Sequence, residues 1–404
     1  MATAVFLSHP TIGHLMPARG VIAELVRRGE RVIVYTTERG CALMAPTGAE
    51  LLLYPAGHDE FDPTPATPGL FSDMARLIAL CERIVPVLTD AVRRHGADYL
   101  LIDSKSLWGR MVAQRSGLPA IKLSVVFAIP RGAIGVGELA AQLYGGGSHD
   151  ALLDGLIAFT RYASRAIAVD HLLGTSAPGV IDFLGNPQAC NIHFTSRAFQ
   201  PAGDEFGADT LFVGPHLDAQ RAAGVDGGGF PFHELDDRPL LYISLGTTFH
   251  DAPEFYAACF EAFATAPWQI VLATGGTRTG SAPENFRVFD RVPQLEILER
   301  AAAAITHGGM NTANEALWHG VPLLVHPQRG DQHIVARRVE ELGAGLRVRE
   351  ATPAALRRDV ERLLGEPSFR AAAEDLGRTL RTAGGAARAA DAIVAFTAAA
   401  GAAA

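Results

Sequence analysis

Short apolar runs alternate with stretches of helical periodicity at the beginning of the chain. Ala4 to Ser8 is an apolar run that predicts a buried strand, and Pro17 to Arg28 carries apolar residues at helical spacing until Gly29 ends it. Arg31 to Thr36 is a second apolar run. This order of strand, helix and strand predicts a βαβ unit and therefore a parallel sheet.

The alternation continues through the first half of the chain, with irregular segments between the elements. Further strands are predicted at Tyr99–Ile102, Ala120–Ser124, Phe194–Thr195 and Leu211–Val213, and helices at Gly109–Ser116, Glu138–Tyr144 and Leu152–Ala168. Asp59 to Gly69 is rich in proline and threonine, which predicts a loop. Pro215 to Pro239 combines glycines and prolines with little periodicity, which is typical of a linker.

A second alternation of strands and helices follows this linker. The expected strands are Leu240–Leu245, Gln269–Ala273, Ala303–Thr306, Pro322–Val325 and Gly345–Val348, and the expected helices are Pro253–Ala266, Gln294–Ala301, Asn311–His319 and Gln332–Leu342. From Thr352 onward the pattern predicts three helices and an unstructured tail of alanine and glycine. Two successive sets of βα units predict an α/β protein with two Rossmann-like domains whose parallel sheets face a central cleft.

The chain length agrees with a division into two domains. A chain of 404 residues is long enough to form two hydrophobic cores. We expect residues 1–215 to form the first domain, residues 216–238 the linker and residues 239–387 the second domain.

The composition is that of a soluble globular protein, with 48% hydrophobic and 19% charged residues. A net charge of −8 offers no basic surface for nucleic acid or an anionic membrane. The only lysines, Lys105 and Lys122, lie outside glycine-rich loops, which excludes a Walker-type phosphate site. Four scattered cysteines indicate neither a zinc site nor a disulfide framework. Because the sequence has no signal peptide and no apolar run of transmembrane length, we expect a cytoplasmic protein.

The run from Thr306 to Glu315 is the strongest functional signal in the chain. A predicted buried strand ends at His307, and the two glycines that follow allow a tight turn into a helix that Asn311 can cap. The free N–H groups and the partial positive charge of a helix N-terminus favour a phosphate group there. His307 and Thr312 add side-chain donors, and Glu315, one turn further on, is placed to reach a ribose.

Polar residues also follow two other strands of the second half. The loop after the Pro322–Val325 strand ends at Asp331 and Gln332, whose carboxylate and amide suit sugar hydroxyls. Ser244 and Thr247 can lend hydroxyls to a phosphate, although on their own they indicate only a turn with a helix cap. No Asp-x-Asp motif occurs to hold a metal ion, so the helix dipole, the histidine and nearby hydroxyls must stabilise a leaving diphosphate. The combination predicts a nucleotide-sugar site.

His14 is the candidate catalytic base in the first half. It lies in the loop after the first predicted strand, and ligands of doubly wound sheets bind beyond the carboxyl ends of the strands. A neutral imidazole there can remove a proton from an acceptor hydroxyl near neutral pH. Asp103 ends another predicted strand, and its carboxylate would fix the tautomer of the imidazole if it bonded to the far ring nitrogen. The alternatives are a structural role for His14 and a helix cap for Asp103.

These strings together resemble family 1 glycosyltransferases of the GT-B fold, and most closely their bacterial macrolide-type branch, which also glycosylates flavonoids. The resemblance covers nearly the whole chain. The residues and segments on which the resemblance rests are Gly13-His14, Asp103, Phe194–Pro201, Phe212–Pro215, Ile243–Thr247, Val292–Leu298, His307-Gly308-Gly309, Gly330-Asp331-Gln332 and Ala383–Gly385.

The resemblance implies an inverting, metal-independent O-glycosyltransferase. Such an enzyme moves a hexose such as glucose from a UDP-sugar to a hydroxyl of a hydrophobic acceptor, for example a flavonoid, polyketide or macrolide. His14 would deprotonate the acceptor oxygen, and Asp103 would orient His14 and balance its charge. The UDP-sugar would be a co-substrate, with no cofactor and no metal, and the protein would be a monomer or a weak dimer.

The resemblance also assigns the two domains and their contacts. The first domain would bind the acceptor and the second the nucleotide sugar, and a last helix at residues 388–404 would pack back on the first domain. The implied donor-binding residues are Ser244 and Thr247 after the first strand, Arg291 and Val292 at the uracil, His307, Gly309, Met310, Asn311 and Thr312 at the diphosphate, Glu315 at the ribose, and Asp331 and Gln332 at the sugar.

The chain departs from the family pattern at two places. The family usually has an aromatic residue that stacks on uracil where this chain has Arg291. A guanidinium plane can also stack on a base, so a TDP-sugar donor stays open as an alternative. The usual Asn-Pro after the catalytic histidine is Leu15-Met16-Pro17 here, which changes the expected shape of the acceptor pocket.

Two other functions share parts of this pattern. UDP-sugar 2-epimerases have a similar two-domain architecture but need no acceptor pocket, and an inactive nucleotide-sugar-binding partner would need no catalytic pair. Aromatic residues expected to line an acceptor pocket favour a transferase; they are Phe61, Phe71, Trp108 and Phe127. The acceptor would lie against the loops around Asp59–Arg76 and Phe127–Tyr144.

Overall fold

The structure is a computed structural model of the chain, and it forms two compact units. It describes residues 1–55, 61, 70–129, 149–177, 179–217, 229–246, 252–328 and 330–403. The first unit comprises Met1–Gln220 and Gly384–Ala404, and the second comprises Arg221–Ala383. Each unit is built around one parallel sheet, which confirms the prediction of two Rossmann-like α/β domains. None of the described helices has the length and hydropathy needed to cross a bilayer.

The described part of the first unit contains a seven-stranded sheet in the order β3-β2-β1-β4-β5-β6-β7, and all of its strand pairs are parallel. Its strands are β1 (Thr3–Leu7), β2 (Arg31–Thr36), β3 (Glu50–Leu53), β4 (Tyr99–Asp103), β5 (Ala120–Ser124), β6 (Cys190–His193) and β7 (Thr210–Phe212). The strand order reverses between β1 and β4, which makes the carboxyl ends of these two strands the topological switch point of the sheet.

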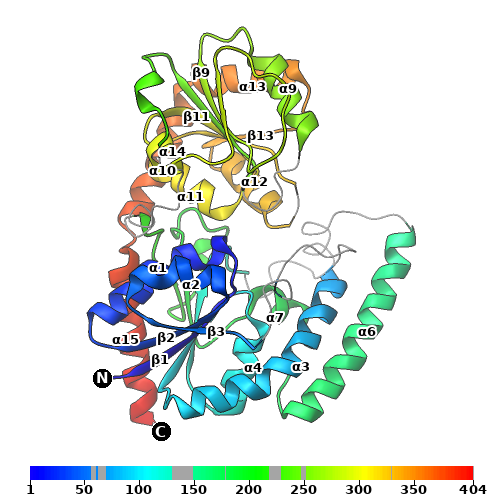
Figure 1. Ribbon diagram of the computed structural model, residues 1–404, viewed down its shortest axis with the longest axis vertical. Coiled ribbons are helices and arrows are strands. Elements are labelled where there is room, and N and C mark those ends of the chain that lie inside the picture. The colour runs from blue at the N-terminus through cyan, green and yellow to red at the C-terminus, as the bar shows by residue number, and fades with distance from the viewer. Residues whose placement is uncertain are drawn as a thin grey trace. The chain divides into compact units, whose positions relative to one another are not determined.

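Helices cover both faces of this sheet (Figure 1). One face carries α1 (Ile12–Arg27), α2 (Glu38–Met44) and α15 (Gly385–Ala403), and the other carries α3 (Leu70–Arg94), α4 (Leu107–Ser116), α6 (His149–Leu173) and α7 (Val180–Gly185). Alternate residues of β1 serve the two faces: Ala4 and Phe6 pack with α1 and α15, whereas Val5 and Leu7 pack with the helices opposite. This double coverage explains why the strands are continuous apolar runs.

The described part of the second unit contains a six-stranded parallel sheet in the order β10-β9-β8-β11-β12-β13. Its strands are β8 (Leu240–Ser244), β9 (Gln269–Ala273), β10 (Phe286–Phe289), β11 (Ala301–Thr306), β12 (Leu323–Val325) and β13 (Gly345–Arg347). Its helices are α9 (Pro253–Phe263), α10 (Gln294–Leu298), α11 (Met310–Trp318), α12 (Gln332–Glu341), α13 (Pro353–Gly365) and α14 (Pro367–Arg381). Here the switch point lies between β8 and β11. Short 3-10 helices occur at Ala45–Thr47, Gly203–Glu205 and Phe232–Glu234.

The C-terminal helix α15 belongs to the first unit. It begins at Gly385, whose N–H donates to the carbonyl of Val213 at 2.7 Å, and it packs its alanines and Ile393 against α1. Arg28 at the end of α1 forms an ion pair with Asp391 at 2.6 Å. The helix continues to Ala403, so the expectation of an unstructured alanine and glycine tail is wrong for the described residues.

Two other local expectations differ from the structure. Helix α1 begins at Ile12 and contains Pro17 in its second turn, whereas the sequence pattern placed the helix start at Pro17. The linker is also shorter than the expected range of 216–238, because residues 229–238 pack on the second unit. Phe230 contacts Phe289 with ring centroids 5.1 Å apart, and the amide of Gln269 donates to the carbonyl of Asp236 at 2.7 Å. Residues 218–228 lie outside the described part of the chain.

Lys122 is an ammonium group buried in the first sheet. It lies on β5, and its Nζ donates to the carbonyl of Gly185 at the C-terminal end of α7, at 2.8 Å. Burial lowers the pKa of Lys122 to about 7, and the carboxylates of Asp103 and Asp209 oppose this shift. The charged form is therefore costly in the folded protein, and a lysine at this position depends on acceptors at a helix end.

We expect the stability of Lys122→Met, relative to the wild-type protein, to fall as the pH rises. The lysine has an ordinary pKa of 10.5 when unfolded, so below about pH 7 the folded wild-type protein bears the full cost of a buried ammonium. Above that pH the folded lysine is neutral while the unfolded chain still binds the proton, so the wild-type free energy of unfolding rises. The difference in the free energy of unfolding between Lys122→Met and the wild type should change by about 2–3 kcal/mol between about pH 6 and about pH 9.

Chemical denaturation at both pH values measures this difference. Lys105→Met is the matched control, because Lys105 is the other lysine of the chain and is exposed. A difference for Lys122→Met that does not change with pH would show that the buried amine stays charged.

Candidate functional site

The structure brings His14 and Asp103 into direct contact at the switch point of the first sheet. His14 lies in the first turn of α1, directly after β1, and Asp103 is the last residue of β4. Nδ1 of His14 is 2.9 Å from both carboxylate oxygens of Asp103. A neutral imidazole that donates its Nδ1–H to the carboxylate keeps the lone pair of Nε2 free to accept a proton.

The carboxylate of Asp103 is fixed before any ligand binds. Asp103 is 1% exposed, and its Oδ1 accepts from the backbone N–H of Lys105 at 2.7 Å. The side-chain amide of Asn186 donates to the carbonyl oxygen of Asp103 at 3.3 Å. Helix α4 has Ser106 as its N-cap, so Asp103 is not the cap of that helix. The alternative in which Asp103 serves only as a helix cap is therefore wrong.

Two aromatic residues that were expected to line an acceptor pocket are part of the core. Trp108 is 0% and Phe61 is 1% exposed, and their rings pack edge to face with centroids 5.1 Å apart. Trp108 Nε1 donates to the hydroxyl of Tyr54 at 3.1 Å, and Tyr54 in turn donates to the carbonyl of Ser8 at 2.7 Å. These rings stabilise the end of β1 and expose no surface to a ligand, which corrects the expectation.

The other two aromatic candidates, Phe71 and Phe127, are near the ends of described segments of the chain. Phe127 is buried against Phe199, with ring centroids 5.2 Å apart. Phe71 is half-buried and packs edge to face on Phe159 of α6. Most of the two loops assigned to the acceptor, residues 62–69 and 130–144 together with 59–60, lies outside the described residues.

Helix α11 in the second unit begins directly after the His307-Gly308-Gly309 turn. Its N-cap is Gly309 and its first residue is Met310, so Asn311 lies inside the first turn and is not the cap that its residue type suggested. Gly308 adopts a positive φ of 87°, which a residue with a side chain rarely adopts. The turn places the first N–H groups of α11 at the carboxyl end of β11, where they can donate hydrogen bonds to an anion.

The ring of His307 sits between two glycines. A Cβ added at Gly246, after β8, or at Gly309 would overlap ring atoms of His307. His307 is half-buried, and the enclosure of its ring lowers its pKa to about 4, whereas the nearby carboxylate of Asp331 opposes this shift by a smaller amount. The imidazole is therefore neutral near pH 7 and offers one N–H donor and one acceptor.

Glu315 is buried and held by a partner that the sequence analysis missed. The side-chain amide of Gln294 donates to Glu315 and, at 3.4 Å, to the hydroxyl of Thr312. Its carbonyl oxygen accepts from the hydroxyl of Tyr242 at 2.8 Å. Gln294 follows Val292-Pro293 in the sequence, and its proximity to α11 was the kind of long-range contact that residue spacing does not show.

The remaining donor candidates are distributed over the loops of the same unit. Gln332 is buried, and its Oε1 accepts from the backbone N–H of Gln328 at 2.8 Å, so it holds the loop that contains Asp331. The hydroxyl of Ser244 accepts from the N–H of Gly246 at 3.3 Å. Arg291 is exposed beside the buried Val292, whereas Thr247 lies outside the described residues. No group of three or more potential metal ligands occurs among the described side chains.

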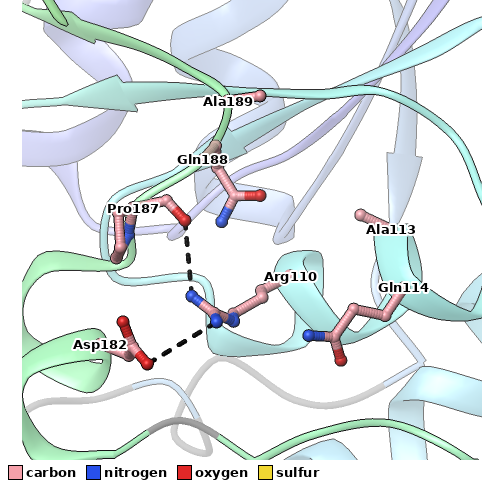
Figure 2. A pocket seen from close by; sticks show the side chains of 7 residues that line it. All are labelled: Arg110, Ala113, Gln114, Asp182, Pro187, Gln188 and Ala189. Carbon is pink, nitrogen blue, oxygen red and sulfur yellow. Dashed lines mark hydrogen bonds and ion pairs between the residues drawn. The ribbon is translucent and has the colours of Figure 1, made fainter. Parts of the chain in front are cut away.

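A pocket of about 440 Å³ lies elsewhere on the first unit, between α4 and the segment that joins α7 to β6 (Figure 2). It is lined by Arg110, Ala113, Gln114, Asp182, Pro187, Gln188 and Ala189. The Arg110 guanidinium points across it, donates to the carbonyl of Pro187 at 3.4 Å and lies 3.8 Å from the carboxylate of Asp182. The pocket contains none of the predicted site residues, and its polar lining does not suit a hydrophobic acceptor.

Known proteins similar to this chain cover it almost from end to end. Residues 264–391 match the family described as erythromycin biosynthesis protein CIII-like, C-terminal domain. The chain is 34% identical over 413 residues to the NDP-glycosyltransferase YjiC of Bacillus licheniformis, with 97% of each chain covered. It is 30% identical to the demethyllactenocin mycarosyltransferase of Streptomyces fradiae, which covers 97% of this chain and 86% of that relative.

A solved structure agrees with these similarities. The crystal structure of CalG4, the calicheamicin glycosyltransferase, superposes with a TM-score of 0.79 at 29% sequence identity. The match covers 98% of each chain. The two parallel sheets and their helices therefore belong to an architecture shared with a glycosyltransferase of known structure.

We expect the imidazole of His307 to remain neutral until the pH falls to about 4, because burial withholds hydration from the protonated, charged form of the ring. In Gly309→Ala the new Cβ displaces the ring from its place between the glycines, so its pKa should rise toward the ordinary value of 6.5. An NMR titration of the ring protons measures both values, and the spectrum of His307→Gln identifies the resonance.

Gly280→Ala is the matched control, because nothing lies within 4 Å of a Cβ added at that glycine. A wild-type His307 that titrates at its ordinary pKa would contradict the enclosure of the ring. An unchanged pKa in Gly309→Ala would contradict the steric role of the glycine.

Proposed function

The chain belongs to the bacterial family 1 glycosyltransferases, and on that premise we propose that it moves a hexose from a UDP-sugar to a hydroxyl of a hydrophobic natural product. Membership makes the protein a transferase of the natural-product type that uses a nucleotide-sugar donor. Glucose as the sugar, uridine as the base and inversion at the anomeric carbon are the finer parts of the proposal. The observation that carries it is the contact of His14 with the buried carboxylate of Asp103.

In this proposal His14 is the general base. Its Nε2 takes the proton of the acceptor hydroxyl, and the acceptor oxygen forms a bond to the anomeric carbon. The bond between that carbon and the diphosphate oxygen breaks, and UDP leaves with the electron pair. One direct displacement inverts the configuration at the anomeric carbon. Asp103 stabilises the imidazolium as it forms, because a buried carboxylate interacts strongly with a positive charge beside it.

The second unit supplies the groups that suit the leaving diphosphate. The N-terminus of α11 offers N–H groups and a partial positive charge, and Thr312 and Ser244 add hydroxyls at the same end of the sheet. His307 is neutral near pH 7, so it can donate a hydrogen bond without first binding a proton. We propose that these donors replace a metal ion in stabilising the leaving group.

The donor contacts follow from the same placement. Glu315 accepts a hydrogen bond from Gln294 and lies about one turn after the start of α11. A diphosphate at the start of the helix would place the attached ribose near this carboxylate. Asp331 starts the next helix with a half-buried carboxylate that suits sugar hydroxyls. Arg291 is exposed and would lie flat on the base, which is a weaker discriminator than an aromatic ring. We therefore propose UDP-sugars as the main donors, with TDP-sugars as the alternative.

The class of acceptor rests on relatives. The Streptomyces relative is named a demethyllactenocin mycarosyltransferase, and the CalG4 structure is that of a calicheamicin glycosyltransferase. We propose an acceptor of similar hydrophobic character, such as a macrolide, another polyketide or a flavonoid. These relatives are transferases, so they give no support to a UDP-sugar 2-epimerase.

We expect His14→Ala to lose transfer by about 10²–10⁴-fold, because general-base catalysis contributes that much to a rate. The affinity for UDP should stay unchanged, since the second unit holds the donor groups. Product mass after incubation with a UDP-sugar and a generic flavonol gives the rate, and calorimetry gives the affinity.

His171→Ala, at an exposed histidine of α6, is the control for a general effect of removing an imidazole. Asp103→Asn keeps the shape of the side chain but removes its charge, so it should also reduce the rate. Near-normal transfer by His14→Ala would overturn the assignment of the base.

We expect Arg291→Ala to weaken UDP binding by about 2- to 5-fold, because stacking of a guanidinium on a ring contributes about 0.5–1 kcal/mol at exposed sites. Arg291→Lys keeps the charge but not the plane, and it should behave like the alanine variant. Calorimetry with UDP and TDP measures the effect. Arg378→Ala, at an exposed surface ion pair, is the control, and an Arg291→Lys variant with the UDP affinity of the wild type would show that only the charge matters.

A further inference from the structure

A second imidazole lies beside the proposed base. His9 follows β1, is 6% exposed, and its ring centroid is 4.9 Å from that of His14 with an interplanar angle of 47°. The ring of Trp108, which is part of the buried core, also lies beside His9, with a centroid distance of 6.2 Å. His9 therefore fills the space between the base and the aromatic cluster at the end of β1.

The side chain of Thr11 is hydrogen-bonded to His9 and does not form the usual capping bond to the helix that it precedes. Thr11 is the N-cap of α1 and has the extended backbone of a capping residue, but its side chain makes no cap hydrogen bond. Its hydroxyl instead lies 3.1 Å from Nδ1 of His9. Thr37 and Thr352 cap α2 and α13 in the ordinary way, with side chains that accept from backbone N–H groups. The hydroxyl of Thr11 thus serves the orientation of a buried histidine.

We propose that His9 is a positioning residue that holds the imidazole of His14 in the plane needed for catalysis, and that Thr11 fixes His9 for this task. The proposal rests on the proposed function of His14 as the base. A hydrogen bond from Nδ1 to Asp103 fixes one point of the His14 ring, but the ring can still pivot about that bond. Such a pivot moves Nε2, the atom that takes the proton. The ring of His9, in contact on one side, blocks it.

The energetic reason is the sensitivity of proton transfer to geometry. A displacement of about 1 Å from the reacting position can reduce a rate by as much as 10²-fold, even when binding is unaffected. The contact of His9 with the His14 ring affects the position of Nε2 relative to the acceptor and does not affect the binding of the nucleotide-sugar donor. Its loss should therefore lower kcat and leave the affinity for UDP unchanged.

The test compares variants of His9 and Thr11 in the full-length protein, with a UDP-sugar and a generic flavonol as substrates. His9→Ala should lower kcat by about 10-fold, with the KM for the donor unchanged. His9→Phe restores a ring but not the bond to Thr11, so its kcat should lie between those of wild type and His9→Ala. Thr11→Val should lower kcat by a few-fold, and Thr11→Ser, which keeps the hydroxyl, should restore it.

Thr352→Val is the matched control, because Thr352 is an N-cap with an ordinary capping bond in the other unit. It should lower the thermal midpoint and leave kcat unchanged, whereas Thr11→Val should lower kcat and leave the midpoint unchanged. Full kcat in His9→Ala, or an equal loss in Thr11→Val and Thr11→Ser, would overturn the proposal.

The same experiments separate this proposal from the one beneath it. If His14→Ala is inactive while His9→Ala has normal kcat, His14 remains the base and only the positioning role is wrong. If His14→Ala is active, the base is elsewhere and both proposals fail. A kcat loss in His9→Ala that comes with a matching loss of UDP affinity would indicate a general disturbance and would also overturn the positioning role.

Discussion

The hydrogen bond between Nδ1 of His14 and the buried carboxylate of Asp103 is the constraint on which the first unit depends. The two residues are 89 positions apart in the sequence and meet because β1 and β4 are adjacent and in register, with Leu7 beside Ile102. A carboxylate that is 1% exposed needs compensation for its lost hydration, and the imidazole and a backbone N–H provide it. The order of the strands in the sheet, and not their order along the chain, therefore brings this pair together.

The second unit uses the same position in its sheet for the opposite kind of charge. Strands β8 and β11 are adjacent, with Ser244 beside Thr306, so the turns that follow them place Gly246 against His307. In the first unit a buried carboxylate is hydrogen-bonded to an imidazole. In the second, an enclosed neutral imidazole and a helix N-terminus favour an anionic ligand. The proposed transfer assigns the acceptor proton to the first arrangement and the leaving diphosphate to the second.

The sequence pattern predicted the features that depend on neighbouring residues, such as the apolar strands. Features that depend on contacts between distant parts of the chain could not be predicted in this way. Apolar runs identified most of the strands, and the residues at their carboxyl ends identified His14 and Asp103. The start of α1 was missed because a proline is common in the first turn of a helix, whereas Pro17 lies in the second turn of α1. The cap of α11 and the bond from Gln294 to Glu315 depend on how the chain returns to β11, which residue spacing does not show.

The aromatic residues of the first unit show how a wrong expectation can still indicate function. Trp108 and Phe61 do not face a ligand; with Tyr54 they form a rigid cluster whose hydrogen bonds end on the carbonyl of Ser8. That carbonyl immediately precedes His9, which contacts both Trp108 and His14. The cluster therefore fixes the backbone that carries the imidazole pair. In the proposed role of His14, a base held in this way is oriented before an acceptor arrives, so the cost of ordering it is met during folding and not during catalysis.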